Sequence, residues 1–430
     1  MANLAVDLKE KSTSKTKIDV TVSKAFKIWI SALTVAFLIG GYFIVERFFT
    51  GLAATNLSSI TPWGAWIAFY IFFVGLSAGS FLLSTLIYVF GMEEYERVGK
   101  AALFTAIVCM IVALTFVLMD LGRPERMLNA IIYWNVTSPL AWEVHFYLVY
   151  IGLLAVELYI AMREDLVRAA RTNSLKGFIA RFITFKNATI NAATKKRDHM
   201  WMKILGTIGI PLAILGVHGG TGTIFAVVKA RPAWHTALFP IIFVVSAMVS
   251  GTALLLAMYV IKKKVQKQPV DQGMVVSLAK LMVGFLIIDL GLQFYEYLIG
   301  WYGLETEHLD TLATMMASEK AWSFWFVQMF LGAVIPITIV FWKKTSQNVN
   351  ALLGAAVLIV IGIIGVRFNI VVPPLVVPVF HELPWGNYAP TIKEWMVSVG
   401  VVAMGLLIYS FGELLLPIEE TSDEVSHNGK

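Results

Sequence analysis

Ten stretches of mainly apolar residues, each close to the length of a membrane-spanning helix, constrain this chain more than any other feature. A transmembrane helix needs about 20 such residues, and 58% of the 430 residues are apolar while 14% are charged. Soluble proteins carry about 25% charged residues, so this chain has too little charge to cover a water-facing surface of its size. We therefore predict an all-α polytopic membrane protein. Its ten expected spans cover residues 28–45, 64–91, 101–120, 140–162, 204–228, 236–261, 281–301, 322–342, 349–372 and 395–416.

The Lys and Arg residues gather in alternate connections between these spans. Most of the 34 fall in the N-terminal tail, in the long connection 163–203 and in other connections expected on the same side. Positive charge marks the cytoplasmic side of a membrane protein, so we expect both termini in the cytoplasm. This topology accounts for the net charge of +6, which therefore does not indicate a nucleic-acid partner. Residues 1–27 are polar, so no cleavable signal peptide is expected. The connection 163–203, which contains KKRDHMWMK, is expected either to form a basic interfacial helix or only to mark the cytoplasmic side by its charge.

Short motifs recur along the chain in the same order, which predicts an internal repeat. Gly79 aligns with Gly251, and the Asp-Leu-Gly motif at Asp120 aligns with the one at Asp289. Each copy contains four spans, so both copies enter the membrane in the same direction, as in a parallel repeat. The predicted organisation is a cytoplasmic basic tail (1–27), a first helix and outer loop (28–61), a first four-helix bundle (62–230, including a basic cytoplasmic loop at 163–203), a second four-helix bundle (231–372), an outer loop and last helix (373–416) and an acidic cytoplasmic tail (417–430).

Several redox cofactors are excluded by the cysteine count. The single cysteine, Cys109, allows neither an intrachain disulfide nor a four-thiolate iron–sulfur cluster. No CxxCH motif for covalent haem occurs either. A b-haem held by His145 and His218 is a weaker alternative, because the second bundle supplies no matching pair.

Ionisable side chains inside the spans are costly and mark candidate functional sites. In the first bundle they fall near the expected outer face: Asp120 ends one span, Glu143 and His145 begin the next, and His218 lies near another outer end. Such groups bind and release protons and hydrogen-bond a carbonyl, and an apolar groove beside them would hold a lipid tail. A quinone needs these features, so we expect a quinone site here. Two interpretations stay open: a structural ion pair of Asp120 with Arg123 at a helix end, and histidines satisfied in the interior.

The remaining ionisable residues divide between the second bundle and the cytoplasmic side. Asp289, Glu296 and Arg367 are candidates for a proton path through the second bundle. Glu157 and Glu413 fall toward the cytoplasmic side, where snorkelling of the side chain toward water is the expected behaviour.

Several motifs resemble those of one known family. They are PWGAWIAFYIFFVGLSAGSFLLS (62–84), DLGRPER (120–126), TSPLAWE (137–143) and ARPAWHTALFPIIFVVSAMVSG (230–251). Together they resemble the NrfD/PsrC family, the membrane subunits of respiratory molybdoenzyme-type and related complexes. The later runs IGVRFNIVVPP and PTIKEWMVSVG are similar to its ten-span branch, which includes the membrane subunits of the quinone reductase complex and of alternative complex III.

The resemblance implies a subunit of the prokaryotic cytoplasmic membrane that binds menaquinone or ubiquinone and holds no haem or iron–sulfur cluster of its own. It would serve anaerobic respiration by exchanging electrons with an extracytoplasmic iron–sulfur (ferredoxin-like) subunit, accompanied by a molybdoenzyme-type or multihaem cytochrome subunit. Asp120 and Arg123 match the family motif of the pocket region. Some members carry a histidine on the leading helix of this bundle, whereas the span here offers Trp66, Tyr70 and Ser77. The expected catalytic residues are Asp120, Glu143 and His145, and the expected quinone-binding residues are Tyr70, Ser77, Asp120, Arg123, His145 and His218.

Other functions remain compatible with the sequence. Parallel repeats and buried carboxylates also occur in secondary transporters and proton-translocating subunits, and a purely structural anchor is a third alternative. The connection 121–139 contains Arg123, Arg126, Tyr133 and Trp134. Because arginine and large aromatic residues are enriched in interfaces, we expect this loop to dock the iron–sulfur subunit. An aromatic belt at the membrane surface is the alternative.

Overall fold

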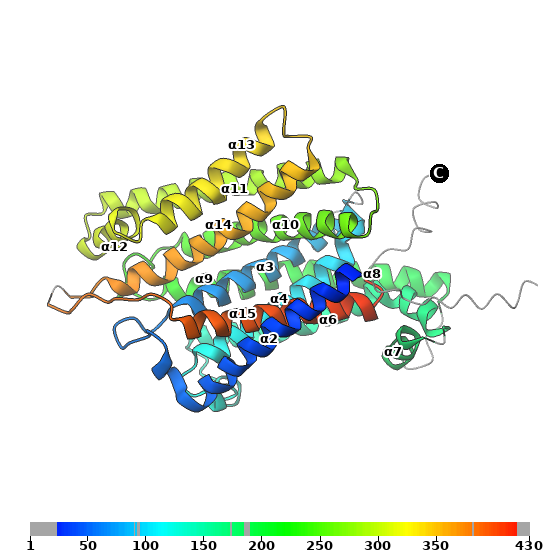
Figure 1. Cartoon of the computed structure of the whole chain (residues 1–430), viewed down its shortest axis with the longest axis horizontal. Coiled ribbons are helices and arrows are strands. Elements are labelled where there is room, and N and C mark those ends of the chain that lie inside the picture. The colour runs from blue at the N-terminus through cyan, green and yellow to red at the C-terminus, as the bar shows by residue number, and fades with distance from the viewer. Residues whose placement is uncertain are drawn as a thin grey trace, which may run out of the picture.

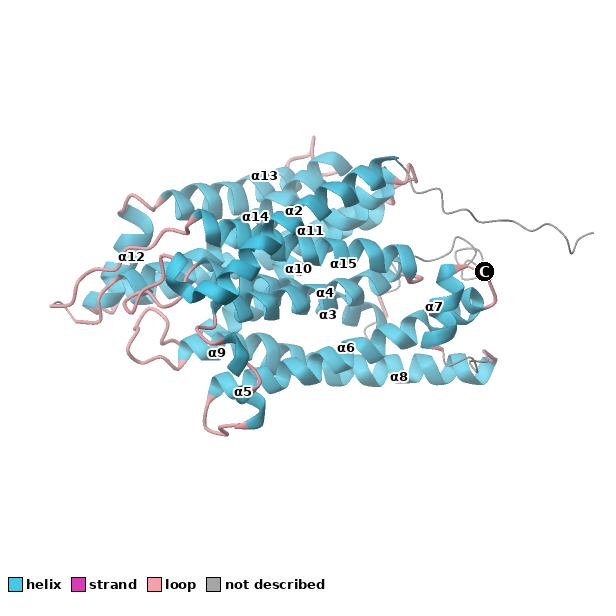
Figure 2. Ribbon diagram, turned by 60° about the horizontal axis from the view of Figure 1, so that its bottom comes forward, coloured by secondary structure: helices cyan, strands magenta, loops and turns pink. Residues whose placement is uncertain are grey.

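A computed structural model describes residues 24–418, except residues 90, 93–94, 173, 185–189 and 381. The predicted basic tail at 1–27 and acidic tail at 417–430 lie almost entirely outside the described residues. Throughout the described part, regular secondary structure is helical and no strand occurs (Figure 2). The all-α prediction is therefore confirmed.

Ten helices or helix series are long and apolar enough to cross a membrane, and they match the ten predicted spans. The chain is a multi-pass helical membrane protein. The spans are formed by α2 (Lys24–Thr50), α3 (Ala65–Tyr88), α4 (Glu96–Asp120), α6 (Pro139–Ala170), the series α8 (Ala192–Pro211), η4 (Leu212–His218) and α9 (Gly219–Ala226), α10 (Phe239–Val265), α11 (Gln272–Tyr302), the pair η5 (Ser323–Val334) and α13 (Ile335–Phe341), α14 (Val349–Val376) and α15 (Ile392–Leu415).

Short helices occupy the connections between spans. Beside the spans lie η1 (Gly51–Ala54), η3 (Pro124–Arg126), α5 (Asn129–Ile132), α7 (Leu175–Ile183) and α12 (Thr306–Ala317). The basic run at 195–203 is helical, but it belongs to α8 and continues into the following span. The amphipathic helix of this connection is α7 instead, where Leu175, Phe178 and Phe182 are exposed along one face.

Local sequence signals explain where several spans begin. Ser138 accepts a hydrogen bond from the backbone N–H of Ala141, and Pro139 occupies the first turn of α6, where its missing N–H costs nothing. At the start of α15, Thr391 and Glu394 form a capping box that satisfies backbone N–H groups at the helix end. Hydrogen bonds within the helix satisfy the rest of the backbone, which a bilayer requires.

The spans pack into two groups that share α3. The first group contains α3, α4, α6 and the α8–η4–α9 series, and the second contains α10, α11, η5–α13 and α14. Helices α2 and α15 pack on each other beside α4 (Figure 1). Two hydrophobic cores follow this grouping, and α3 contributes Phe81 to one core and Phe72 to the other. The predicted boundaries of the two bundles stay predictions.

A very close crossing joins α3 to α10. A Cβ atom added at Gly79 would lie 2.0 Å from the carbonyl oxygen of Ala247, and one added at Gly251 would lie 2.3 Å from the carbonyl carbon of Gly79. Small residues let helix backbones approach in this way. These two glycines are the pair that the predicted internal repeat aligns. A two-fold axis that relates equivalent helices would bring such a pair together. The repeat itself remains a prediction.

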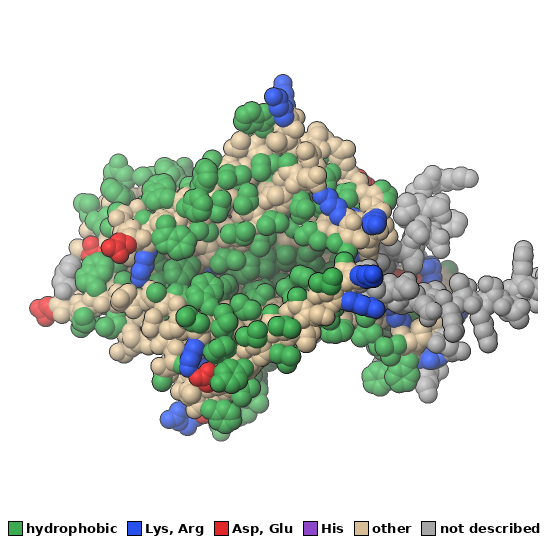
Figure 3. All heavy atoms as spheres, viewed as in Figure 1, with side chains coloured by type: hydrophobic (Ala, Val, Ile, Leu, Met, Phe, Trp, Pro, Cys, Tyr) green, Lys and Arg blue, Asp and Glu red, His purple; other side chains and the backbone are tan. Residues whose placement is uncertain are grey.

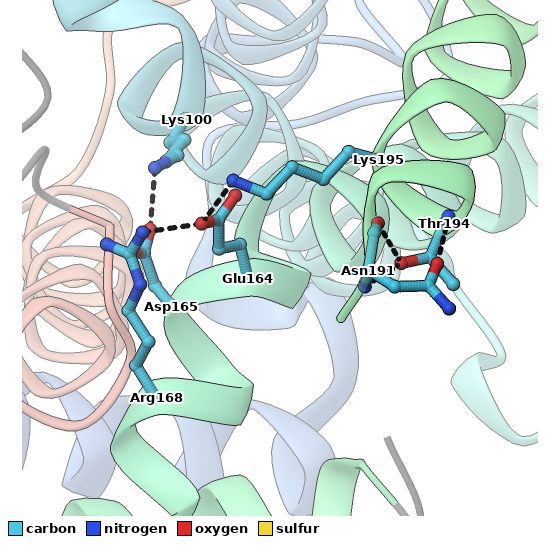
Figure 4. A network of polar contacts seen from close by, with 7 residues as sticks. All are labelled: Lys100, Glu164, Asp165, Arg168, Asn191, Thr194 and Lys195. Carbon is cyan, nitrogen blue, oxygen red and sulfur yellow. Dashed lines mark hydrogen bonds and ion pairs between the residues drawn. The ribbon is translucent and has the colours of Figure 1, made fainter. Parts of the chain in front are cut away.

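Charge and apolar surface are separated along the molecule. On the face drawn in Figure 3, hydrophobic side chains cover most of the middle, and Lys and Arg lie mainly toward the ends and edges. The start of α2, the end of α15 and helix α7 share one end of the molecule (Figure 1). At this end Lys100 Nζ lies 2.7 Å from Asp165 Oδ2, and Lys195 Nζ lies 2.7 Å from Glu164 Oε1, so ion pairs tie α4 and α8 to α6 (Figure 4).

Candidate functional site

A buried cluster of hydroxyls around one carboxylate lies among α3, α6 and α9. The Tyr147 hydroxyl donates to Glu143 Oε1 at 2.5 Å, and its oxygen lies 2.6 Å from the Tyr70 hydroxyl and 2.8 Å from Thr221 Oγ1. All four side chains are buried. Glu143 and Tyr147 are four residues apart on α6, so they project from the same face of the helix. We call Tyr70, Glu143, Tyr147 and Thr221 the hydroxyl–carboxylate cluster.

His218 lies one helical turn from Thr221, at the end of the π-helical segment η4. Its side chain has no exposed surface and lies against the backbone of Val74 and Gly75 on α3. Neither ring nitrogen has a hydrogen-bond partner of good geometry among the residues that the structure describes. The π-helical geometry begins directly after Pro211, which cannot donate a backbone hydrogen bond. Because π-helical segments are frequent at functional sites, His218 is a strong candidate to hydrogen-bond a ligand.

Asp120 belongs to a different cluster, at the end of α4 beside α2. It interacts electrostatically with Arg47, which is buried and donates to the carbonyl oxygens of Met119, at 2.8 Å, and Leu121. Arg123 is exposed, and the described residues show no ion pair between it and Asp120, so the interpretation of these two residues as an ion pair is wrong. The helix end is instead held by Arg47 from α2, a partner that the local sequence does not reveal.

The loop before α15 completes this second cluster. The Tyr388 hydroxyl donates to Glu394 Oε1 at 2.6 Å and accepts a hydrogen bond from the backbone N–H of Ala65 at 2.8 Å. Burial raises the pKa of Tyr388 well above its ordinary value, and the neighbouring Glu394 carboxylate raises it further. Tyr388 therefore stays protonated and joins the start of α3 to the start of α15.

Two other predicted residues lie apart from the hydroxyl–carboxylate cluster. His145 is only half-buried, stacks on Trp134 with ring centroids 4.2 Å apart, and its Nδ1 lies 2.7 Å from the carbonyl oxygen of Ala141. It follows Glu143 by two residues and so points to the opposite side of α6. Ser77 donates to the carbonyl oxygen of Ala106 at 2.7 Å and so links α3 to α4. The predicted set is thus distributed over several places, and only Tyr70 and Glu143 meet in one cluster.

The predicted residues of the second bundle also fall into two separate places. Asp289 and Arg367 are fully buried and interact electrostatically. Glu296 is buried as well, but it accepts a hydrogen bond from Thr236 at 3.0 Å. Among the described residues, no group of three or more His, Cys, Asp or Glu side chains is placed to hold a metal ion.

Sequence reasoning missed Tyr147, Thr221 and Arg47, and it misjudged Glu157. The spacing of Tyr147 four residues after Glu143 was a usable signal, whereas nothing local pointed to Arg47. Glu157 is 2% exposed, so the prediction that it reaches toward water is wrong. Glu413 forms an ion pair with Lys262 near the surface.

Comparison with known proteins assigns the chain to a family. The family model described as "Polysulphide reductase, NrfD" matches residues 53–379. A selenate reductase subunit of Mesobacillus selenatarsenatis is 38% identical over 413 residues, covering 93% of this chain and 96% of the relative. The Hdr-like menaquinol oxidoreductase integral membrane subunit of Archaeoglobus fulgidus is 29% identical over 87% of this chain and 90% of its own length. The menaquinone reductase integral membrane subunit of Nitratidesulfovibrio vulgaris is 25% identical over 91% and 92%, respectively. This chain therefore belongs to the NrfD polysulphide reductase family of membrane subunits.

Proposed function

We propose that this chain is the quinone-interacting membrane subunit of a respiratory oxidoreductase complex. The observation that carries the proposal is the buried hydroxyl–carboxylate cluster, with the buried His218 one turn away, in a membrane chain of this family. The names of two relatives, a menaquinol oxidoreductase subunit and a menaquinone reductase subunit, support a quinone substrate and favour menaquinone over ubiquinone.

The chemistry of the hydroxyl–carboxylate cluster suits proton exchange with a quinone. Thr221 also donates to the carbonyl oxygen of Val217 at 2.7 Å, so three hydroxyl groups take part in four close contacts. Each hydroxyl carries a single proton. The cluster gains a full set of hydrogen bonds when Glu143 carries a fourth proton. We infer that Glu143 takes up a proton when a quinol is oxidised and gives one up when a quinone is reduced.

Electrons require a partner, and its nature is also part of the proposal. We propose an extracytoplasmic iron–sulfur subunit that docks at the end of the molecule containing the 121–139 connection, together with a molybdoenzyme-type or multihaem subunit. Both termini would then lie in the cytoplasm of a prokaryotic cell. The family membership and the reductase names of the relatives support an assembly of this kind.

The test is quinone-linked turnover of the purified complex carrying Glu143→Gln. General acid–base groups contribute typically 10²–10⁴-fold, so we expect a loss of about that size in quinone turnover. Electron transfer within the partner subunits, assayed with a soluble dye, should persist. Tyr147→Phe should give a smaller loss in the same direction, because it removes the hydroxyl that binds Glu143.

Tyr159→Phe is the matched control, because it removes a hydroxyl from the same helix outside the cluster. Co-purification of the partner subunits checks assembly of each variant. A Glu143→Gln complex that assembles and keeps full quinone turnover would contradict the proposed site.

A further inference from the structure

Five buried side chains of the second bundle form an unbroken hydrogen-bonded chain. Ser323 donates to Asn369 at 2.5 Å and Asn369 to Gln328 at 2.8 Å; Gln328 donates to Gln293 at 2.8 Å and Gln293 to Asp289 at 2.7 Å. The members come from η5, α14 and α11, and each is at most 7% exposed. Because buried polar groups are costly in a membrane, a chain of this length calls for a function.

All donors in the chain point the same way, toward the carboxylate of Asp289. Hydrogen bonds to a charged acceptor are stronger than neutral ones, and aligned bonds reinforce one another. Amide side chains neither gain nor lose protons under ordinary conditions, so Gln293, Gln328 and Asn369 are poor proton carriers. The chain instead fixes the position of Asp289.

Asp289 faces groups that connect it to the first bundle. Arg367 interacts electrostatically with both Asp289 and His218, donates to Ser246 at 3.0 Å, and lies 4.6 Å from the centroid of the Phe243 ring. Gly75 on α3 lies beside both groups and has no side chain to separate them. A Cβ atom added at Gly75 would lie 3.6 Å from Arg367 Nη2 and 3.9 Å from His218 Cε1. His218 and Arg367 thus approach each other from different bundles across a glycine.

These groups retain unused hydrogen-bonding capacity. Within the described part of the chain, no hydrogen-bond partner of good geometry is found for Asp289 Oδ1, for Arg367 Nε and Nη1, or for either nitrogen of His218. Tyr297 on the same helix also interacts electrostatically with Asp289, and residues of α10 and α3 near Arg367 include Ser246, Ser250 and Gly75. A buried site with several polar partners is suited to ordered water, and a neutral imidazole offers one donor and one acceptor nitrogen.

We propose that His218, Asp289 and Arg367 form a hydrated proton-holding site between the two bundles, and that Gln293, Gln328 and Asn369 position Asp289 within it. The proposal rests on the proposed quinone function. Oxidation of a quinol releases two electrons, which pass to one-electron iron–sulfur carriers of the partner subunit, and two protons, one of which leaves directly to the solution without entering this site. One proton passes from the hydroxyl–carboxylate cluster to the imidazole of His218 and through water to the carboxylate of Asp289. Arg367 stays charged and keeps the site neutral when Asp289 is ionised.

The experiment mixes the oxidised complex rapidly with menadiol in a weakly buffered, anaerobic solution. Absorbance of the partner's metal centres follows the electrons, and a pH-indicator dye follows the protons. In the wild type we expect one proton to appear more slowly than the electrons, because it leaves from a buried site. In Asp289→Asn the delayed phase should disappear, while the menadiol concentration for half-maximal rate stays unchanged. Asp289→Glu, which keeps a carboxylate, should restore the delay.

Glu296→Gln is the matched comparison, because it removes a buried carboxylate from the same helix outside the hydrogen-bonded chain, and its effect should be smaller. If Asp289→Asn fails to assemble, Gln328→Leu breaks the chain two bonds away and should shorten the delay. A wild-type delay that persists in Asp289→Asn or Gln328→Leu, or a larger effect of Glu296→Gln, overturns the proposal. Absence of any menadiol-driven reduction in the wild type would instead contradict the proposed function.

Discussion

At the residue scale, Arg47 has two structural effects with one guanidinium group. It binds two carbonyl oxygens at the end of α4, and it supplies positive charge next to Asp120, whose Oδ1 is buried without a hydrogen-bond partner. Free carbonyl groups at the end of a helix need such partners. A buried carboxylate likewise needs an opposite charge. Without Arg47, the two carbonyl oxygens would lack a hydrogen-bond donor and the Asp120 carboxylate would lack a positive charge.

We therefore predict that Arg47→Ala destabilises the protein by about 2–6 kcal/mol, because each of the two carbonyl oxygens left without a hydrogen-bond donor costs about 1–3 kcal/mol. Thermal or denaturant unfolding of the purified protein in detergent measures the change. Arg123→Ala, which removes an exposed arginine from the adjacent connection, should change stability by less than about 0.5 kcal/mol. Equal effects of the two substitutions would show that Arg47 has no special role.

The sequence could identify individual residues of the candidate site but not how they group. Glu143, Tyr70 and His218 stood out because polar groups are rare inside spans, and the structure places all three in the core of the first bundle. Asp120 and Arg123 are close in sequence, yet the helix ends between them, so Arg123 points into solvent. The partner of Asp120 lies 73 positions earlier, and no local pattern in the sequence could indicate it.

At the scale of elements, the crossing of α3 and α10 depends on two glycines in backbone contact. Gly79→Ala would place a methyl group 2.0 Å from a backbone oxygen that cannot move without shifting α10. Overpacking of this kind costs typically 1–3 kcal/mol. We predict a loss of stability at least that large, measured by the same unfolding assay.

Gly354 on α14 provides the control for this prediction, because a Cβ atom there meets nothing within 4 Å. Gly354→Ala should be neutral or stabilising, since alanine is favoured over glycine in a helix by about 1 kcal/mol. If Gly79→Ala behaves like Gly354→Ala, the two helices do not cross as closely as described.

Span positions were predictable because a minimum apolar length is required to cross a bilayer, and each of the ten runs meets it. Features that depend on irregular backbone geometry were not predictable. The π-helical segments η4 and η5 depend on hydrogen-bond shifts within otherwise ordinary apolar runs. Helix α12 was missed because its sequence, TEHLDTLATMMA, is too polar and too short for a span.

At the scale of the whole molecule, the two ends of the long axis carry different polar features. One end holds α7, the ion pairs of Figure 4 and the exposed basic residues of α8. The opposite end holds the connection between α4 and α6, with Tyr133 75% exposed and Trp134 41% exposed. Trp134 stacks on His145 and packs edge-on against Trp142 at 4.9 Å, so this connection is fixed to the start of α6. A fixed, exposed surface close to the candidate quinone site is suited to docking a redox partner.

This arrangement predicts which end of the molecule would bind the iron–sulfur subunit that we propose as its partner. Arg126 is exposed on this connection, and arginine is enriched in protein interfaces, where it pairs with acidic partners. Arg126→Glu should therefore weaken subunit association by about tenfold or more, equivalent to about 1.4 kcal/mol, as measured by recovery of the iron–sulfur subunit at increasing salt. Lys196→Glu reverses an exposed charge at the opposite end and should leave recovery unchanged. If Lys196→Glu releases the iron–sulfur subunit and Arg126→Glu does not, the subunit binds at the α7 end, and the electrons would have to cross the length of the first bundle to reach a quinone held beside Glu143.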